Sequence, residues 1–393
     1  MPRAGSDRAA ILAGPFTLAV GAAIAVGTAI SMQGSRALAL FAIGIALGAT
    51  LYHSAFGFAS AYRRLFEQRG THAVRAQLVM LAAATALFAP VLAQGEWFGS
   101  EVVGAIAPAG LQVGAGAFLF GIGMQLAGAC GSGSLYAAGG GQLRMIVTLA
   151  AFCAGSFWAS LHMDAWARLP APEPVALGET IGWPAALAVQ LAVLAALFWM
   201  LGRLPGAELD ARPPGAPGAW RVLSGPWPLA VGALALAGLN ALTLVLAGHP
   251  WTITWAFTLW GAKIARVLGW SPDGDPFWSA DFQREALDSS VMTDVTSVMD
   301  FGLVIGALAA ASLAGGFRLR FGPSPRAAIA AALGGLAMGY GARIAYGCNV
   351  GAFFSGIAST SLHGWLWIAA ALPGSWVGLQ LRPMLGLVER RPS

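Results

Sequence analysis

About ten stretches of roughly twenty apolar residues recur along this chain of 393 residues, and they constrain its fold more than any other feature. A helix of about twenty residues covers about 30 Å, which is the thickness of the hydrocarbon core of a bilayer. Only 10% of the residues are charged, whereas soluble domains carry about 25%. The pattern predicts an all-α integral membrane protein and argues against a soluble enzyme. The expected spans are 9–30, 37–58, 76–94, 110–129, 145–162, 184–201, 228–247, 299–316, 327–347 and 364–381.

Arginine placement predicts the orientation, because short loops rich in Lys and Arg stay cytoplasmic. A complete crossing by the apolar segment 252–269 would put Arg318 and Arg320 outside. We therefore expect this segment to be re-entrant and to return to the external side. The acidic run from Asp281 to Asp300 then lies outside, where it suggests a solvated amphipathic helix. The loop that fixes the cytoplasmic side follows the second span and contains Arg63, Arg64, Arg69 and Arg75.

Two halves joined by a cytoplasmic linker are predicted from a change in composition. Region 202–226 is rich in Pro and Gly and carries scattered charges, which is typical of a connection. The first half then covers 1–201 and the second half 227–393. The first apolar segment lacks an obvious small-residue cleavage site, so we expect it to remain as a span.

The most specific feature is an internal repeat with a constant offset of 218 residues. The stretch from Gly121 to Gly133 aligns without gaps on the stretch from Gly339 to Gly351, and this alignment places Cys130 opposite Cys348. The alternation of loops makes the first copy enter the membrane from outside and the second from inside, so the repeats are inverted. Transporters built from inverted repeats hold their substrate near the midplane, where helices are broken.

We expect a site for a small anion at these breaks. Backbone N–H groups in glycine-rich turns form anion-binding concavities, and half-helix N-termini add partial positive charge. Neutral thiols are weak donors and would hold a soft, sulfur-bearing anion loosely enough for passage. Two cysteines that only pack as small hydrophobes would fit equivalent repeat positions poorly. The predicted pathway residues are Gln125, Cys130, Gly131, Ser132, Gly133, Arg343, Gly347, Cys348, Asn349 and Gly351.

Three segments make the sequence resemble the YeeE/YedE family of bacterial inner-membrane sulfur transporters, whose studied members take up thiosulfate. These segments are Gly121–Tyr136, Gly347–Gly351 and His53–Arg64. The resemblance implies an hourglass-shaped path along which cysteines pass thiosulfate onward through weak hydrogen bonds to its sulfur. Cys130 and Cys348 match two of these cysteines, whereas a third is replaced here by Gly57. Another sulfur or selenium compound is the alternative substrate.

Several other residues have both a functional and a structural interpretation. Arg343 would either attract the anion or cap carbonyl groups of a broken helix. Lys263 and Arg266 would line the path or extend to the membrane interface. Cys153 has no cysteine opposite it in the second copy and is expected to pack. The isolated histidines predict no metal site.

Two alternatives belong to other classes of protein. An intramembrane enzyme would use Ser132 or Ser134 with His363 as base, or the paired thiols in redox exchange, but the sequence shows no activating partner for either. If the protein were a membrane scaffold, neither the serine pair Ser132 and Ser134 nor the cysteine pair Cys130 and Cys348 would matter to flux.

We therefore predict a permease of the bacterial inner membrane for a small sulfur-containing anion, with thiosulfate as the first candidate. The sequence implies no cofactor and no nucleic-acid partner. The lipid bilayer surrounds the spans, and a cytoplasmic sulfur-carrier protein is a further candidate partner.

Overall fold

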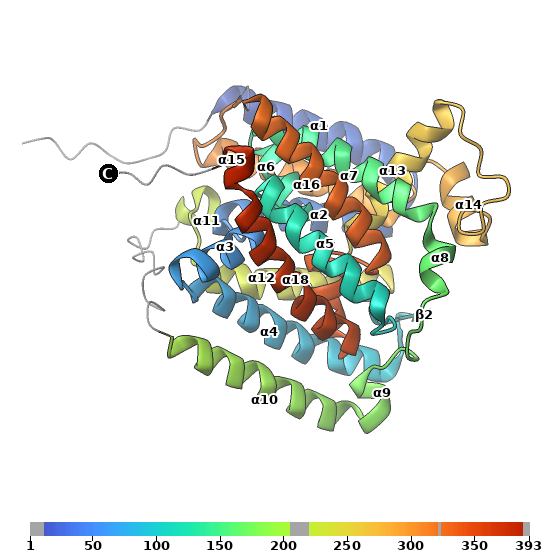
Figure 1. Ribbon diagram of the computed structural model, residues 1–393. Coiled ribbons are helices and arrows are strands. Elements are labelled where there is room, and N and C mark those ends of the chain that lie inside the picture. Colours follow the sequence, from blue (N-terminus) through green and yellow to red (C-terminus); the bar gives the residue numbers. More distant parts are fainter. Residues whose placement is uncertain (1–11, 205–219, 321–323, 388–393) are drawn as a thin grey trace, which may run out of the picture.

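A computed structural model describes residues 12–204, 220–320 and 324–387, and nearly all of its regular structure is helical (Figure 1). The only strands in this part of the chain are β1 (Glu96–Trp97) and β2 (Ser100–Glu101), which form a small hairpin. The predicted all-α fold is confirmed. Most of the predicted linker, residues 205–219, and the start of the first span lie outside the described residues.

The helices up to the linker are α1 (Ala13–Ser31), α2 (Ser35–Ser54), α3 (Phe58–Gln68), α4 (His72–Gln94), α5 (Leu111–Ala127), α6 (Gly131–Gly139), α7 (Arg144–Ser160), α8 (Met163–Ala167), α9 (Leu177–Ile181) and α10 (Trp183–Gly202). Those after it are α11 (Trp220–Ser224), α12 (Leu229–Ala247), α13 (Thr254–Val267), α14 (Asp281–Asp288), α15 (Val295–Leu313), α16 (Pro325–Ile344), η1 (Asn349–Phe354), α17 (Ser355–Ala358), α18 (Leu362–Leu381) and η2 (Pro383–Leu385).

Eight helical segments of the described chain are long and apolar enough to cross a bilayer, and they coincide with eight of the ten predicted spans. The other two predicted spans correspond to α7, an apolar helix of 17 residues, and to α18, a helix of 20 residues. The helices run broadly along one direction, as a membrane bundle requires (Figure 1). An integral membrane protein is the fold class that these elements show.

The two copies of the repeat meet where α5 crosses α16. A Cβ atom placed on Gly116 would lie 2.5 Å from the carbonyl oxygen of Gly341, and one placed on Gly123 would lie 2.6 Å from that of Gly334. The offset of 218 residues converts one pair into the other, so the same contact occurs twice about a two-fold axis. Residue numbers rise along α5 as they fall along α16. The inverted arrangement predicted from the sequence is therefore confirmed.

The remaining helices follow the same symmetry. The packing of α7 along α16 corresponds to that of α18 along α5. The packing of α2 along α15 corresponds in the same way to that of α12 along α4. α1 and α10 then occupy equivalent places, because α1 lies on α15 and α10 lies on α4. Both are only slightly buried and lie at the outside of the bundle (Figure 1). By packing, α10 is the counterpart of α1, and the division of the chain at the linker stays a prediction.

α12 runs antiparallel to α2. At one end a Cβ placed on Gly232 would lie 2.5 Å from the Cβ of Ser54. At the other end Arg36 Nε donates to the carbonyl oxygen of Leu246. The end of α12 therefore lies at the end of the bundle where α2 begins.

α15, in contrast, runs parallel to α2. Glycines of α2 touch its backbone in register, Gly44 against Met299 and Gly48 against Leu303. α15 therefore begins where α2 begins, which is also where α12 ends. Because the chain between α12 and α15 starts and finishes at the same end, α13 does not cross the bundle. The re-entrant prediction for 252–269 is confirmed.

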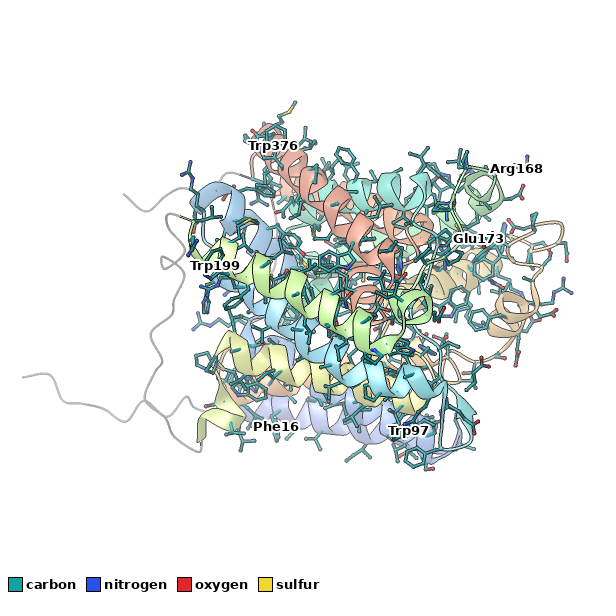
Figure 2. The ribbon with its side chains drawn as sticks, turned by 90° about the horizontal axis from the view of Figure 1, so that it is seen from below. Phe16, Trp97, Arg168, Glu173, Trp199 and Trp376 are labelled. Atoms are coloured by element: carbon teal, nitrogen blue, oxygen red, sulfur yellow. The ribbon has the colours of Figure 1, made fainter. Side chains whose placement is uncertain are left out.

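The two ends of the bundle differ in charge. We name them the hairpin end, where β1 and β2 lie beside the end of α12, and the linker end, where α10 ends and α12 begins. Figure 2 shows Arg168 and Glu173 at the hairpin end and Trp199 at the opposite end. The described connections at the linker end contain Arg69, Arg203, Arg318 and Arg320, whereas those at the hairpin end contain Glu96, Glu101, Glu173, Asp273 and Asp275 against Arg168. This is the distribution expected if the linker end is cytoplasmic.

The acidic run from Asp281 to Asp300 differs from its prediction. Only Asp281–Asp288, which is α14, is a separate helix with a strongly polar surface. Asp294 is the N-cap of α15, and its carboxylate accepts a hydrogen bond of 2.7 Å from Ser297 N. Asp300 lies in the second turn of α15 and is fully buried. The predicted single solvated helix is wrong, because an Asp at the N-cap starts a new apolar helix there.

Candidate functional site

Each repeat contains a helix that is broken just before its cysteine. α5 ends at Gly128, whose φ of 82° turns the chain, and Cys130 is the N-cap of α6. α16 ends at Ile344, after which Tyr346 and Gly347 also have positive φ angles. Cys348 is the N-cap of η1. The structure thus places both cysteines at helix breaks and in the same structural role, as the repeat predicts.

The N-cap position brings each thiol next to helix N–H groups. Cys130 Sγ lies 3.4 Å from Ser132 Oγ, and Cys348 Sγ accepts a hydrogen bond of 3.4 Å from Val350 N. The first N–H groups of a helix have no partner within that helix and carry its partial positive charge. A thiol at this position therefore shares its surroundings with donors suited to an anion.

The two breaks lie side by side, and we name the region between them the constriction. A Cβ placed on Gly131, the first residue of α6, would lie 3.9 Å from Cys348 Sγ and 3.8 Å from the rings of Phe152 and Phe257. Cys130 and Cys348 are 2% and 1% exposed. The constriction is therefore closed around both thiols, and aromatic rings form part of its wall.

Polar atoms without partners gather around this constriction. The amide nitrogen and oxygen of Asn349, next to Cys348, are buried and make no hydrogen bond in the structure. Ser134 Oγ in the first turn of α6 also has no partner, whereas Tyr62 Oη, which lacks a well-formed hydrogen bond, interacts with the Asn349 side chain beside it. Buried polar groups are almost always paired. These groups have the capacity to hold a polar ligand or water where the two half-helices begin.

A cavity of about 640 Å³ leads toward Cys348 from the hairpin end. Its wall includes Thr252, Thr296 and Gly347, and α14 covers it from outside. Gly347 directly precedes Cys348, which is itself buried and is not part of the wall. We name this space the outer cavity, because it lies at the hairpin end beside the second break.

Arg343 is the cationic group of this outer cavity. Its guanidinium carbon lies 5.2 Å from the centroid of the Phe277 ring, and its Nε is buried without a hydrogen-bond partner. A capping arginine would donate to carbonyl oxygens of the break. The unpaired Nε instead favours the first of the two interpretations, attraction of the anion.

Some predicted residues have other contacts. Gln125, the counterpart of Arg343, donates from Nε2 to Ala59 O at 3.0 Å and so ties α5 to α3. Lys263 donates to the carbonyl oxygens of Leu287 and Ser289. It therefore ties α13 to the segment around α14, and its two predicted roles, lining the path and extending to the interface, stay predictions. Arg266 has the same role through its ion pair with Asp288.

The glycines of the two turns differ in the room around them. A Cβ on Gly133 would lie 3.4 Å from Cys130 Sγ, and one on Gly351 would lie 3.1 Å from Thr252 Oγ1. Both turns are therefore tight against polar or sulfur atoms. Their role as ligands of a substrate stays a prediction.

The sequence analysis missed two residues that lie beside the breaks, Arg144 and Tyr62. Arg144, the first residue of α7, has Nη2 2.9 Å from a Cβ placed on Gly128. Its side chain therefore lies against the break beside Cys130, and Arg63 is its electrostatic neighbour. An arginine that directly follows the polar turn after α6 was the available signal. Tyr62 was also missed, although it lies within the His53–Arg64 segment.

Neither serine that the enzyme alternative named as nucleophile is paired with a base among the described residues. Ser134 Oγ has no hydrogen-bond partner, and Ser132 Oγ contacts only the Cys130 thiol among the described hydrogen bonds. His363 Nδ1 lies 2.7 Å from Ser361 Oγ instead. The three cysteines are free thiols. Within the described ranges no group of His, Cys, Asp and Glu is arranged to hold a metal ion.

Comparison with known proteins agrees with this geometry. The family described as Sulphur transport matches residues 53–377. The chain is 30% identical over 284 residues, 66% of its length, to the thiosulfate transporter TsuA of Spirochaeta thermophila, and the match covers 74% of that protein.

Two further relatives are named probable transporter YedE. The chain is 34% identical over 152 residues to the protein of Salmonella typhimurium and 36% identical over 133 residues to that of Escherichia coli K12. These matches cover 39% and 34% of the chain but only 37% and 32% of those proteins. The names are those of transporters and not of enzymes. From residue 53 to residue 377, therefore, the chain belongs to the Sulphur transport family.

Proposed function

We propose that this protein carries thiosulfate, or a closely similar sulfur-bearing anion, inward across the bacterial inner membrane through the constriction between Cys130 and Cys348. The relative named as a thiosulfate transporter supports this substrate class. The linker end is then cytoplasmic, in agreement with its arginines.

The observation that carries the proposal is the equivalence of the two cysteines. Each is the N-cap of a half-helix that starts at a break, and Gly131 of one break faces Cys348 of the other. A packing role would not require thiols at both symmetry-related positions. A substrate that passes from one half to the other meets the same chemistry twice.

The path has three stages. Arg343 draws the anion into the outer cavity, where the ring of Phe277 beside its guanidinium displaces water and strengthens the attraction. The anion then loses its hydration water and binds instead to helix N–H groups, the Asn349 amide and the Cys348 thiol. It next reaches Cys130 and leaves past Arg144.

Thiols suit this passage because they are weak donors. A strong, bidentate partner would trap the anion in the constriction, whereas conduction requires binding that also permits release. A thiolate would repel the anion, so both cysteines act in the neutral form. The outer sulfur of thiosulfate is large and polarizable, and it matches the S–H group better than the oxygen of sulfate does.

Purified protein in liposomes tests the proposal. Cys130→Ser and Cys348→Ser should lower thiosulfate flux by at least tenfold and reduce the preference for thiosulfate over sulfate. Cys153→Ser is the matched control, because Cys153 is a buried thiol on α7 outside the two breaks. Equal flux of sulfate and thiosulfate through the unaltered protein would contradict selection by thiols.

The same vesicles separate the alternatives. If a selenium analogue or sulfite crosses the membrane faster than thiosulfate does, that compound becomes the proposed substrate. The proposed path is unchanged by that result. Unchanged flux in both cysteine variants would place the path elsewhere in the protein, and an absence of flux through the unaltered protein would favour the scaffold interpretation. Binding of a cytoplasmic sulfur-carrier protein at the basic linker end is a separate proposal, tested by adding such a protein on that side.

A further inference from the structure

A buried carboxyl group in α15 has no role in the path described so far. Asp300 is 0% exposed, and neither of its carboxyl oxygens has a hydrogen-bond partner in the structure. Burial of an unpaired ionised carboxylate is very costly, so such a group is held in its neutral, protonated form. An ionisable residue inside a membrane span marks an ion or proton pathway in many transporters.

Asp300 lies one helical turn further along α15 than the wall of the outer cavity. Thr296 lines the cavity and is four residues before Asp300, so the two side chains share one face of α15. The thiols of Cys348 and Cys153 are electrostatic neighbours of the Asp300 carboxyl. A charge on Asp300 would therefore be felt at the first cysteine that the anion meets.

Within the part of the chain that the structure describes, no cation forms an ion pair with Asp300. Its electrostatic neighbour on α15 is Asp294, another acid. Lys263 on α13 is bonded to the carbonyl oxygens of Leu287 and Ser289 near α14. Other elements packed against α15 also carry titratable side chains, namely Arg36, Tyr52 and His53 near the two ends of α2, Tyr136 on α6 and Arg266 on α13. Neither α1 nor the described side chains of α11 contribute one.

The anion and an ionised Asp300 are mutually exclusive. Two negative charges close together in a poorly hydrated site repel each other strongly. Binding of the anion near Cys348 therefore requires a proton on Asp300, and by linkage the proton binds more tightly when the anion is present. This reciprocity is the thermodynamic condition for carrying the two together.

We propose that Asp300 couples anion uptake to protons, a role that rests on the proposed function above. One carboxylate oxygen accepts one proton from water in the outer cavity before the anion reaches Cys348. The proton returns to water at the linker end once the anion has left and the path has opened there. No other bond forms or breaks.

Liposomes with the membrane potential clamped at zero test this coupling. With the outer solution one pH unit more acidic than the lumen, the unaltered protein should accumulate labelled thiosulfate up to about tenfold, since one proton moved across one pH unit supports a tenfold ratio. Asp300→Asn should abolish accumulation but retain exchange of labelled for unlabelled thiosulfate. Asp288→Asn, an acid of α14 in an exposed ion pair, is the control and should accumulate normally.

A second variant and a second readout guard against misfolding. Asp300→Glu should keep the response to the pH gradient. Infrared difference spectra of the unaltered protein against Asp300→Asn at neutral pH should show the C=O stretch of a protonated carboxylic acid. A carboxylate signal there would overturn the proposal.

The outcomes distinguish this inference from the proposed function. Thiosulfate flux that does not depend on the pH gradient, or that depends on a sodium gradient instead, would overturn proton coupling. It would not contradict thiosulfate transport itself. Accumulation by Asp300→Asn equal to that of the unaltered protein would also overturn it. An absence of thiosulfate flux under every condition would contradict the proposed function itself.

Discussion

Gly131 faces Cys348 across the constriction, with 3.9 Å between the sulfur atom and the position that a Cβ on the glycine would occupy. The two residues belong to different repeats, so this approach joins the two halves at the proposed site. The glycine leaves open the space next to the thiol. Its neighbours in that space are rings of Phe152 and Phe257 at ordinary contact distance.

Gly131→Ala should therefore lower thiosulfate flux and leave the fold intact. The added methyl group makes only van der Waals contacts, but it occupies the space through which the anion must pass. We expect at least a tenfold loss of flux in liposomes with little change in melting temperature. Gly114→Ala in α5, where a Cβ would meet nothing within 4 Å, is the control. A flux equal to that of the control would place the path elsewhere.

Gly123→Ala should destabilise the protein, because it disrupts the crossing of α5 and α16. The new Cβ would lie 2.6 Å from Gly334 O and 2.8 Å from Met338 N, both backbone atoms that must shift. Overpacking of this kind costs ~1–3 kcal/mol. Thermal denaturation in detergent measures the effect. Gly238→Ala in α12 has open space around its Cβ and should be neutral or slightly stabilising.

Arg343→Gln should weaken capture of the anion more than its passage. The guanidinium lines the outer cavity and does not lie in the constriction. We expect the KM for thiosulfate to rise about tenfold, or ~1.4 kcal/mol, with a smaller change in maximal flux. Arg343→Lys retains the charge and should recover part of the affinity. A fall in maximal flux with an unchanged KM would instead assign Arg343 a role in holding the break.

The two thiols should react from opposite sides of the membrane. Cys348 adjoins the outer cavity through Gly347, whereas Cys130 lies beside Arg144 toward the linker end. In a protein whose only thiol is Cys348, a membrane-impermeant thiol reagent should label from the hairpin end. In one whose only thiol is Cys130, it should label from the linker end. Mass spectrometry of vesicles of known orientation measures both, and labelling of both thiols from one side would contradict a path between them.

Apolar length and arginine placement, both local properties of the chain, predicted the spans and the re-entrant α13. The offset of 218 residues likewise predicted an inverted repeat with a cysteine at each break, since equivalent sequences fold into equivalent structures. The sequence-based prediction was wrong where the same local pattern of acidic residues occurs both on an exposed helix and inside a buried one. Asp300 continues an acidic run that is exposed in α14. A new apolar helix, α15, begins at the N-cap Asp294, and Asp300 is buried within it.

Only the tertiary structure decided which residues surround the two thiols. Gly131 meets Cys348, Tyr62 meets Asn349, and Arg144 meets the break at Gly128 through contacts between residues far apart in the chain. Spacing along one helix carries no information about such contacts, because they depend on how α5, α16, α3 and α7 pack. The sequence by itself determined that this protein has two half-helices with a cysteine at each start. The packing of the glycines on α5 and α16 decided that both starts share one constriction, since without a side chain at those positions the helices approach closely enough for the breaks to meet.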